Sequence, residues 1–171
     1  MYRAMANFWR WIHDAEHRRR VALLAETPVF AGLPRSLLGR LATRLFEKRY
    51  EASEEIFHEG DPGRALFVVA AGRVEIVRAD DGGERQLAVL AAPAAFGEMA
   101  LIDDQPRLAT ARALEPTSLL ILYRAHFEDL MAGDPRVAIA LSRNLLARLA
   151  TYVRQRRSEA EGPAATRREG T

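Results

Sequence analysis

Turn-forming residues divide the middle of the chain, residues 46–124, into short apolar segments. The sequence Gly-Asp-Pro-Gly at 60–63 and the sequence Asp-Asp-Gly-Gly at 80–83 are turn clusters, and the second is typical of a tight hairpin. Residues 65–71 form a nearly continuous apolar run, as a buried strand does, and residues 117–123 predict a further strand. Several short strands between regular turns predict an antiparallel β-sandwich or β-roll.

Helical patterns flank this β region on both sides. Residues 4–25 predict an amphipathic helix, and Pro34 predicts the start of a second one. Apolar residues recur at helical spacing: Phe8, Trp11, Ile12 and Ala15 in the first helix, and Leu37, Leu38, Leu41 and Leu45 in the second. Residues 125–132 predict a short helix, and Asp134 with Pro135 predicts the N-terminus of a last one. The fold class is therefore mainly β with flanking helices.

The last helix, predicted from Pro135 to about Arg157, carries apolar residues on two faces. One side is lined by Leu141, Leu145 and Leu149. Another side carries, at seven-residue spacing, Ile139, Leu146 and Val153. Two apolar faces indicate two contacts, one with the β-roll and one with a second copy of the chain. We therefore predict a homodimer through this helix; one broad core face in a monomer is the alternative.

These patterns divide the 171 residues into four segments. An N-terminal amphipathic helix occupies 1–27, the β-roll with its helices 28–134, and the long C-terminal helix 135–157. Residues 158–171 are rich in Gly, Ala, Glu and Arg and are predicted to be a disordered tail. The hydrophobic fraction of 49% is sufficient to bury a core.

Composition excludes several classes of protein. The chain has no cysteine, so it has no disulfide, thiol nucleophile or thiolate metal site, which fits the cytoplasm. No apolar run approaches the ~20 residues that span a bilayer, and no signal-peptide core is present at the start. A net charge of +2 is a weak reason to expect nucleic-acid binding, and residues 158–171 are too few for a helix-turn-helix. The four histidines are scattered, so we predict no metal, no cofactor and no enzyme activity.

Residues 96–110 combine groups that suit a small ligand with a phosphate and a sugar. Gly97 allows close approach of the backbone, and the N–H groups of Met99 and Ala100 can begin a helical turn that points at an anion. Glu98 can accept hydrogen bonds from a ribose hydroxyl, and Arg107 can pair with a phosphate through two parallel hydrogen bonds. Without ligand, Glu98 and Arg107 are expected to pair with each other or with solvent.

This stretch, hereafter the cassette, resembles the phosphate-binding cassette of the cyclic-nucleotide-binding domain family. That family includes the catabolite activator protein and the regulatory subunit of cAMP-dependent protein kinase. The sequences Ile-Phe-His-Glu-Gly-Asp at 56–61 and Ala-Gly-Arg-Val-Glu-Ile at 71–76 extend the resemblance, which covers roughly residues 28–155. It implies a jelly-roll-like β-roll with N-terminal helices and a long C-terminal helix.

The resemblance also implies a role for individual residues. Glu98 corresponds to the ribose anchor and Arg107 to the phosphate clamp. Backbone contacts are implied for Gly97, Met99, Ala100, Leu108 and Ala109. The resemblance places Ile76, Ala88 and Leu90 around the sugar and base, although each of them, taken alone, is better explained as ordinary core. From the last helix, Arg148 aligns with a basic residue that approaches the cassette carboxylate, and Tyr152 is placed to stack on a purine.

Two departures from the family pattern affect the expected ligand. Leu108 stands where relatives usually have Ser, Thr or Ala, so it offers no hydroxyl to a phosphate or to a guanine amino group. This favours cAMP over cGMP, although a leucine here could also crowd the phosphate. The sequence Ala-Pro-Ala-Ala at 92–95 replaces a Gly-Asp turn, and Pro93 lacks a backbone donor, so the approach to the cassette is expected to differ in shape.

We therefore predict a non-catalytic sensor of a cyclic nucleotide, cAMP with cGMP as the second choice, which acts through its C-terminal helix or dimer interface on an effector protein. The alternative is a ligand-independent scaffold that acts by protein–protein interaction. Contact of residues 4–20 with a membrane surface is the least favoured option, because the segment is short and carries Asp14 and Glu16.

Overall fold

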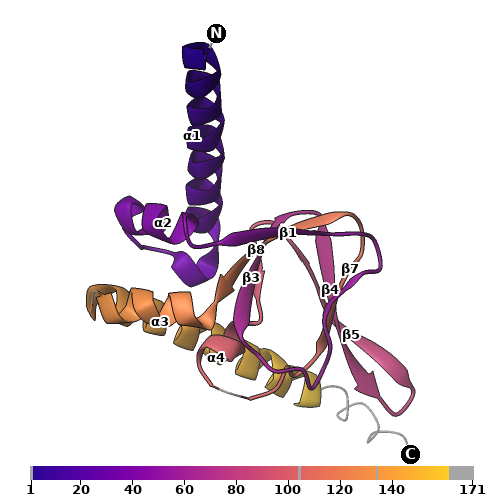
Figure 1. Ribbon diagram of the computed structural model, residues 1–171. Coiled ribbons are helices and arrows are strands. Elements are labelled where there is room, and N and C mark those ends of the chain that lie inside the picture. The colour runs from indigo at the N-terminus through magenta and orange to yellow at the C-terminus, as the bar shows by residue number, and fades with distance from the viewer. Residues whose placement is uncertain (1, 104, 134, 162–171) are drawn as a thin grey trace, which may run out of the picture.

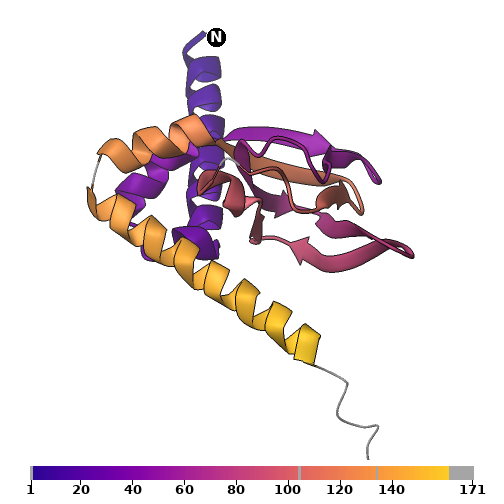
Figure 2. The same cartoon turned by 90° about the horizontal axis from the view of Figure 1, so that it is seen from below.

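Two four-stranded antiparallel sheets form a β-roll, and helices from both ends of the chain pack on one side of it (Figures 1 and 2). The computed structural model describes residues 2–103, 105–133 and 135–161, and it describes side chains for residues 13–154 apart from 100, 104 and 134. The predicted β-roll with flanking helices is confirmed.

The sheets have the strand orders β1-β8-β3-β6 and β2-β7-β4-β5. The first comprises β1 (Phe46–Tyr50), β8 (Thr117–Tyr123), β3 (Ala65–Ala71) and β6 (Ala95–Phe96). The second comprises β2 (Glu55–Phe57), β7 (Thr110–Ala113), β4 (Arg73–Asp80) and β5 (Gly83–Ala91). Asp80 pairs with Gly83 across the β4–β5 hairpin, which leaves Asp81 and Gly82 as the two-residue loop. Gly83, which follows this loop, has φ of +125°, a conformation that glycine adopts without steric cost.

Strand β3 is uniformly apolar because both of its faces are buried. Leu66 and Val68 pack into the cluster formed with the helices. Phe67 and Val69 pack into the second cluster, which fills the interior of the roll. Successive side chains of a strand point to opposite faces, so one strand can supply both clusters.

The helices are α1 (Tyr2–Glu26), α2 (Arg35–Ala42), α3 (Arg124–Gly133) and α4 (Pro135–Glu161), with short 3-10 helices η1 (Pro28–Phe30) and η2 (Glu98–Leu101). Leu45 is buried but lies beyond the end of α2, where it was expected within the helix. The first part of α1 projects away from the roll (Figure 1). The side chains of Phe8, Trp11 and Ile12, and the expected cap Asp134, lie outside the described residues.

Helix α4 ends at Glu161, four residues beyond the predicted end at Arg157. Residues 158–161 are therefore helical, and assigning them to a disordered tail was wrong. Their sequence, Ser-Glu-Ala-Glu, contains good helix formers, and the stop signal Gly-Pro comes only at 162–163. The rest of the predicted tail, 162–171, lies outside the described residues.

One face of α4 packs on the rest of the molecule and another is open. Leu141 and Leu145 are buried in the cluster with the helices. Asn144 donates from its side-chain amide to the carbonyl oxygens of Val29 (3.0 Å) and Ala31 (2.9 Å), which fixes α4 against η1. The open face carries Ile139, Leu146 and Val153, exposed by 70%, 64% and 57%. None of the described helices combines the length and apolarity needed to cross a membrane.

Candidate functional site

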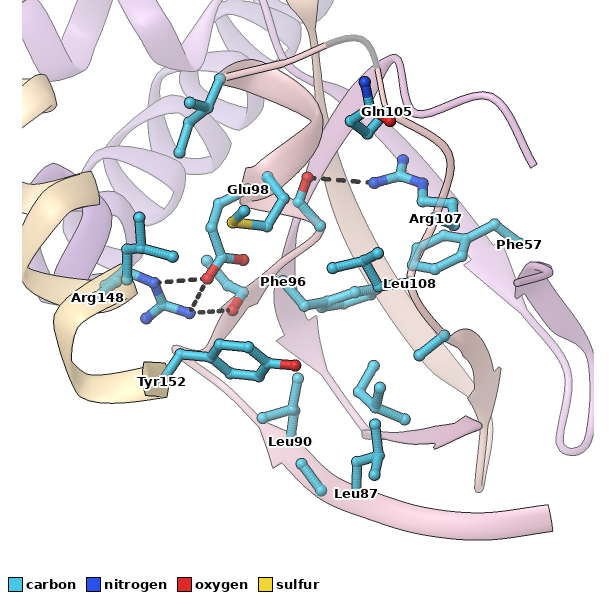
Figure 3. A pocket seen from close by; sticks show the side chains of 18 of the residues that line it. Phe57, Leu87, Leu90, Phe96, Glu98, Gln105, Arg107, Leu108, Arg148 and Tyr152 are labelled. Carbon is cyan, nitrogen blue, oxygen red and sulfur yellow. Dashed lines mark hydrogen bonds and ion pairs between the residues drawn. The ribbon is translucent and has the colours of Figure 1, made fainter. Parts of the chain in front are cut away.

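A cavity of about 290 Å³ opens between the roll, the cassette and α4 (Figure 3). Eleven of the predicted site residues line it: Ile76, Ala88, Leu90, Gly97, Glu98, Met99, Arg107, Leu108, Ala109, Arg148 and Tyr152. The side chain of the twelfth, Ala100, lies outside the described part of the chain. The structure thus brings residues from four segments of the sequence to one hollow.

Gly97 shapes the start of the cassette. It caps η2 with φ of +74°, a left-handed conformation that glycine adopts without steric cost. A Cβ atom at this position would lie 2.7 Å from Nη1 of Arg107. Gly97 is therefore needed both for its backbone conformation and for the room that it leaves to the guanidinium.

The Arg107 guanidinium is buried at one end of the cavity. Nη2 donates to the Ala65 carbonyl oxygen at 2.8 Å and Nη1 to that of Gly97 at 3.2 Å. Its central carbon lies 4.2 Å from the centroid of the Phe57 ring, in cation–π contact. Phe57 was not predicted as a site residue, although it lies within the glycine-bearing motif 56–61, because an apolar side chain alone does not indicate a ligand.

Arg107 is a buried cation without a carboxylate partner among the described residues. Its side chain is 9% exposed, and its Nε has no hydrogen-bond partner in the part of the chain that the structure describes. Burial lowers the pKa of Arg107 from its ordinary value, while Asp61 and Glu98 act at longer range to raise it. A guanidinium stays protonated in a protein, so this end of the cavity carries a positive charge that an anion would stabilise.

Glu98 does not pair with Arg107; it turns toward α4 (Figure 3). Its Oε1 accepts from Nε of Arg148 at 3.1 Å and forms an ion pair with Nη2 at 3.0 Å. Nη2 of Arg148 also donates to the Ala95 carbonyl oxygen at 2.9 Å. The expectation that Glu98 would pair with Arg107 or with solvent was wrong, because Arg148 of α4 lies close enough to form an ion pair with it.

The wall between these two ends is largely apolar. Ile76 and Leu90 project from β4 and β5, Leu108 lies in the cassette and Tyr152 comes from α4. Leu108 is 56% exposed and Tyr152 42% exposed, so both lie at the mouth. A flat aromatic ring could stack against such a wall, but the wall offers few polar groups to hydrogen-bond the edge of that ring.

Pro93 lies in a tight turn just before the cassette. The Ala94 N–H donates to the Ala91 carbonyl oxygen at 2.8 Å and closes a turn around Pro93. The Val69 N–H then donates to the Ala94 carbonyl oxygen at 2.9 Å, and β6 pairs with β3 immediately afterwards. The hydrogen bonds of this turn come from residues 69 and 94, so the turn does not need a backbone N–H at residue 93.

The sequence profile of a family described as "Cyclic nucleotide-binding domain" matches residues 47–134. The chain belongs to the cyclic nucleotide-binding domain family. This family consists of non-catalytic sensor domains, which confirms the prediction that the chain is not an enzyme. Among the described residues no group of three or more His, Cys, Asp or Glu side chains could hold a metal ion.

A curated protein and two solved structures resemble the chain over more than two thirds of its length. The Cyclic AMP receptor protein of Thermus thermophilus is 41% identical over 131 residues, which are 75% of this chain and 58% of that protein. The N-terminal domain of a transcriptional regulator from Streptomyces coelicolor A3(2) matches with a TM-score of 0.70 and 35% identity, over 76% of this chain and 94% of that chain. The regulatory domain of Toxoplasma gondii PKA, co-crystallised with cAMP, matches with a TM-score of 0.65 and 30% identity, over 68% of this chain and 44% of that chain. The chain spans less than two thirds of the length of the curated receptor.

Proposed function

We propose that the chain binds a 3′,5′-cyclic nucleotide, with cAMP as the preferred ligand, and acts as a sensor. The observation that carries this proposal is the buried Arg107, which has no carboxylate partner among the described residues and faces a cavity large enough for a small ligand. A phosphodiester brings the negative charge that this guanidinium lacks, so binding would offset the cost of burying it. The names of the relatives, a cyclic AMP receptor and a PKA domain crystallised with cAMP, agree with this ligand.

Each part of cAMP has a matching part of the cavity. The phosphate would accept hydrogen bonds from Arg107, and the free ribose hydroxyl would donate to Glu98. The adenine would lie against Ile76 and Leu90, with Tyr152 stacked over its other face. Leu108 offers no hydrogen bond to the amino group of guanine, so we expect cAMP to bind more tightly than cGMP.

Calorimetric titration of the full chain with cAMP, cGMP and 5′-AMP tests the proposal. We expect cAMP to bind with micromolar or tighter Kd and cGMP more weakly. 5′-AMP is the matched chemical control because it has the same base and sugar but an open, doubly charged phosphate. If neither cyclic nucleotide gives heat or a thermal shift, the chain is a ligand-independent scaffold.

Ligand binding would be transmitted through Arg148. Glu98 is held to α4 by Arg148, so a ribose hydroxyl that uses the same carboxylate would weaken that contact and shift the equilibrium between positions of α4. An effector protein, in the cytoplasm, would then recognise the altered helix. Hydrogen exchange with and without cAMP is expected to change in α4 around residues 145–152; unchanged exchange in α4 would refute this route.

We further propose that the open face of α4 forms a parallel homodimer. Its three exposed apolar residues, Ile139, Leu146 and Val153, recur every seven residues, as the contact positions of a coiled coil do. Leu146→Glu is expected to give a monomer by light scattering after size exclusion, because it places a charge in the apolar contact. Thr151→Glu, on an exposed position away from this stripe, is the matched control and should stay dimeric. A wild-type chain that is monomeric at about 100 μM, well above the Kd of an ordinary stable interface, would contradict the dimer.

A further inference from the structure

Two neighbouring residues of β5, Leu87 and Ala88, both line the cavity, and Figure 3 shows Leu87 on its lower wall. In a regular strand successive side chains point to opposite faces, so two neighbours would not share one face. Here Ile76 of β4 pairs with Ala88, and the next residue, Val77, pairs with Gln86. This register leaves Leu87 as an extra residue of β5, a β-bulge, and such bulges redirect side chains. The bulge therefore adds Leu87 to the apolar wall of the cavity.

Arg112 of β7 is the centre of a side-chain network on the opposite face of the same sheet. Its Nε donates to Oε1 of Glu75 on β4 at 2.8 Å, and its Nη2 donates to Oε2 of Glu84 on β5 at 2.6 Å. Oε2 of Glu75 accepts in turn from the side-chain amide of Gln86 at 3.0 Å. The network thus joins three strands, and its two members on β5 lie immediately before the bulge at Leu87.

The charges of this network favour its present arrangement. The side chains of Arg112 and Glu75 are only 25% and 14% exposed. The hydrogen bond from Arg112 lowers the pKa of Glu75, and the hydrogen bonds to Glu84 and Glu75 raise the pKa of Arg112, so Arg112 and Glu75 stay ionised at neutral pH. A third carboxylate, that of Glu55 on β2, lies 4.0 Å from Nη1 of Arg112. Without the guanidinium these carboxylates would repel one another across the sheet.

Strand β5 needs such a connection because it is the edge strand of its sheet and its pairing with β4 shifts register at the bulge. A bulge interrupts the ladder of hydrogen bonds, so the backbone alone holds the strand less firmly there. The network connects β5 to both β4 and β7 at this point.

We propose that Arg112 is a positioning residue for ligand binding, which fixes the bulge that turns Leu87 into the cavity. This inference rests on the proposed function, since the base of the nucleotide would lie against the wall to which Leu87 belongs. Arg112 itself does not line the cavity and would not touch the ligand. Its effect on affinity would therefore depend on Leu87.

The test is calorimetric titration with cAMP of the full chain, of Arg112→Ala, of Leu87→Ala and of the double variant. We expect each single substitution to weaken binding about fivefold. The double variant should bind about as weakly as the weaker single variant, because the loss of the bulge matters little once the side chain at 87 is shortened. Two independent effects would instead multiply to about 25-fold.

Arg73→Ala is the matched control. Arg73 also belongs to β4 of this sheet and pairs through Nε and Nη2 with a carboxylate, that of Glu115, at 3.1 and 2.8 Å. It lies at the end of β4 away from the β4–β5 hairpin and does not line the cavity, so this variant should bind cAMP as wild type. Gln86→Ala removes one link of the network without changing any charge, and it provides the test if Arg112→Ala does not fold. It should weaken binding about two- to threefold, and not at all in the Leu87→Ala background.

Two outcomes would overturn this inference while the proposed function stands. In the first, Arg112→Ala is folded and binds cAMP like Arg73→Ala. In the second, the losses of Arg112→Ala and Leu87→Ala multiply, which would mean that Arg112 supports the fold without acting through Leu87. A wild-type chain that binds no cyclic nucleotide would instead refute the proposed function, and this inference with it. Chemical unfolding of each variant verifies that affinities are measured on folded protein.

Discussion

Arg107→Ala is expected to weaken cAMP binding about a hundredfold while the chain remains folded. The substitution removes the charge-assisted hydrogen bonds to the phosphate, an effect of about 3 kcal/mol. The phosphate would then be placed in a cavity end walled by Phe57 without the guanidinium that would neutralise it. Stability should change little, because losing hydrogen bonds to two backbone carbonyls is offset by no longer burying a guanidinium.

Calorimetry with two further variants separates charge from geometry. Arg107→Lys keeps a positive charge but cannot form two parallel hydrogen bonds, so its affinity should lie between those of wild type and Arg107→Ala. Arg64→Ala removes an exposed arginine that lies just before β3 and does not line the cavity, so this variant should bind as wild type. Near-normal binding by Arg107→Ala would mean that the phosphate is held elsewhere.

The fold could be read from the sequence where local signals were strong. Strands β3 and β8 have the predicted bounds, 65–71 and 117–123, because a glycine follows the first apolar run and a proline precedes the second. The end of α4 was misplaced because no local break follows Arg157. The next break in the sequence is the Gly-Pro pair at 162–163.

The candidate site was predictable where its chemistry lies within one segment. Gly97, Glu98 and Arg107 are close in sequence, and their residue types alone suggest a sugar and a phosphate. Contacts between segments that are far apart in the sequence could not be predicted from residue types alone. The placement of Arg148 near Glu98 was predicted only from the family resemblance. Glu98 pairs with Arg148 and not with Arg107 because of where α4 crosses the cassette.

One feature of the site gave no usable signal in the sequence. Phe57 is one apolar residue of a strand, and nothing in its spacing indicates that its ring lies under a guanidinium. Sequence patterns assign residues to a face of a strand, whereas a pocket depends on which loop covers that face.

Gly97→Ala is the second large effect that we expect, a loss of at least tenfold in cAMP affinity. The alanine Cβ would lie 2.7 Å from Nη1 of Arg107 and 3.3 Å from the Ala65 carbonyl oxygen. The guanidinium is the end of a flexible side chain, so it can move away at little cost in stability. That movement takes it from the position in which it would meet the phosphate, and a small misplacement of a bidentate group weakens binding strongly.

Gly32→Ala is the matched control for this variant. Gly32 has φ of +76°, close to the +74° of Gly97, but a Cβ there would meet no atom within 4 Å. Both variants therefore incur the same backbone cost, about 1–2 kcal/mol in chemical unfolding, since alanine is disfavoured in the left-handed conformation. Only Gly97→Ala should lose affinity as well. Equal affinities for the two variants would show that the room beside Arg107 is unimportant, and that Gly97 serves the backbone turn alone.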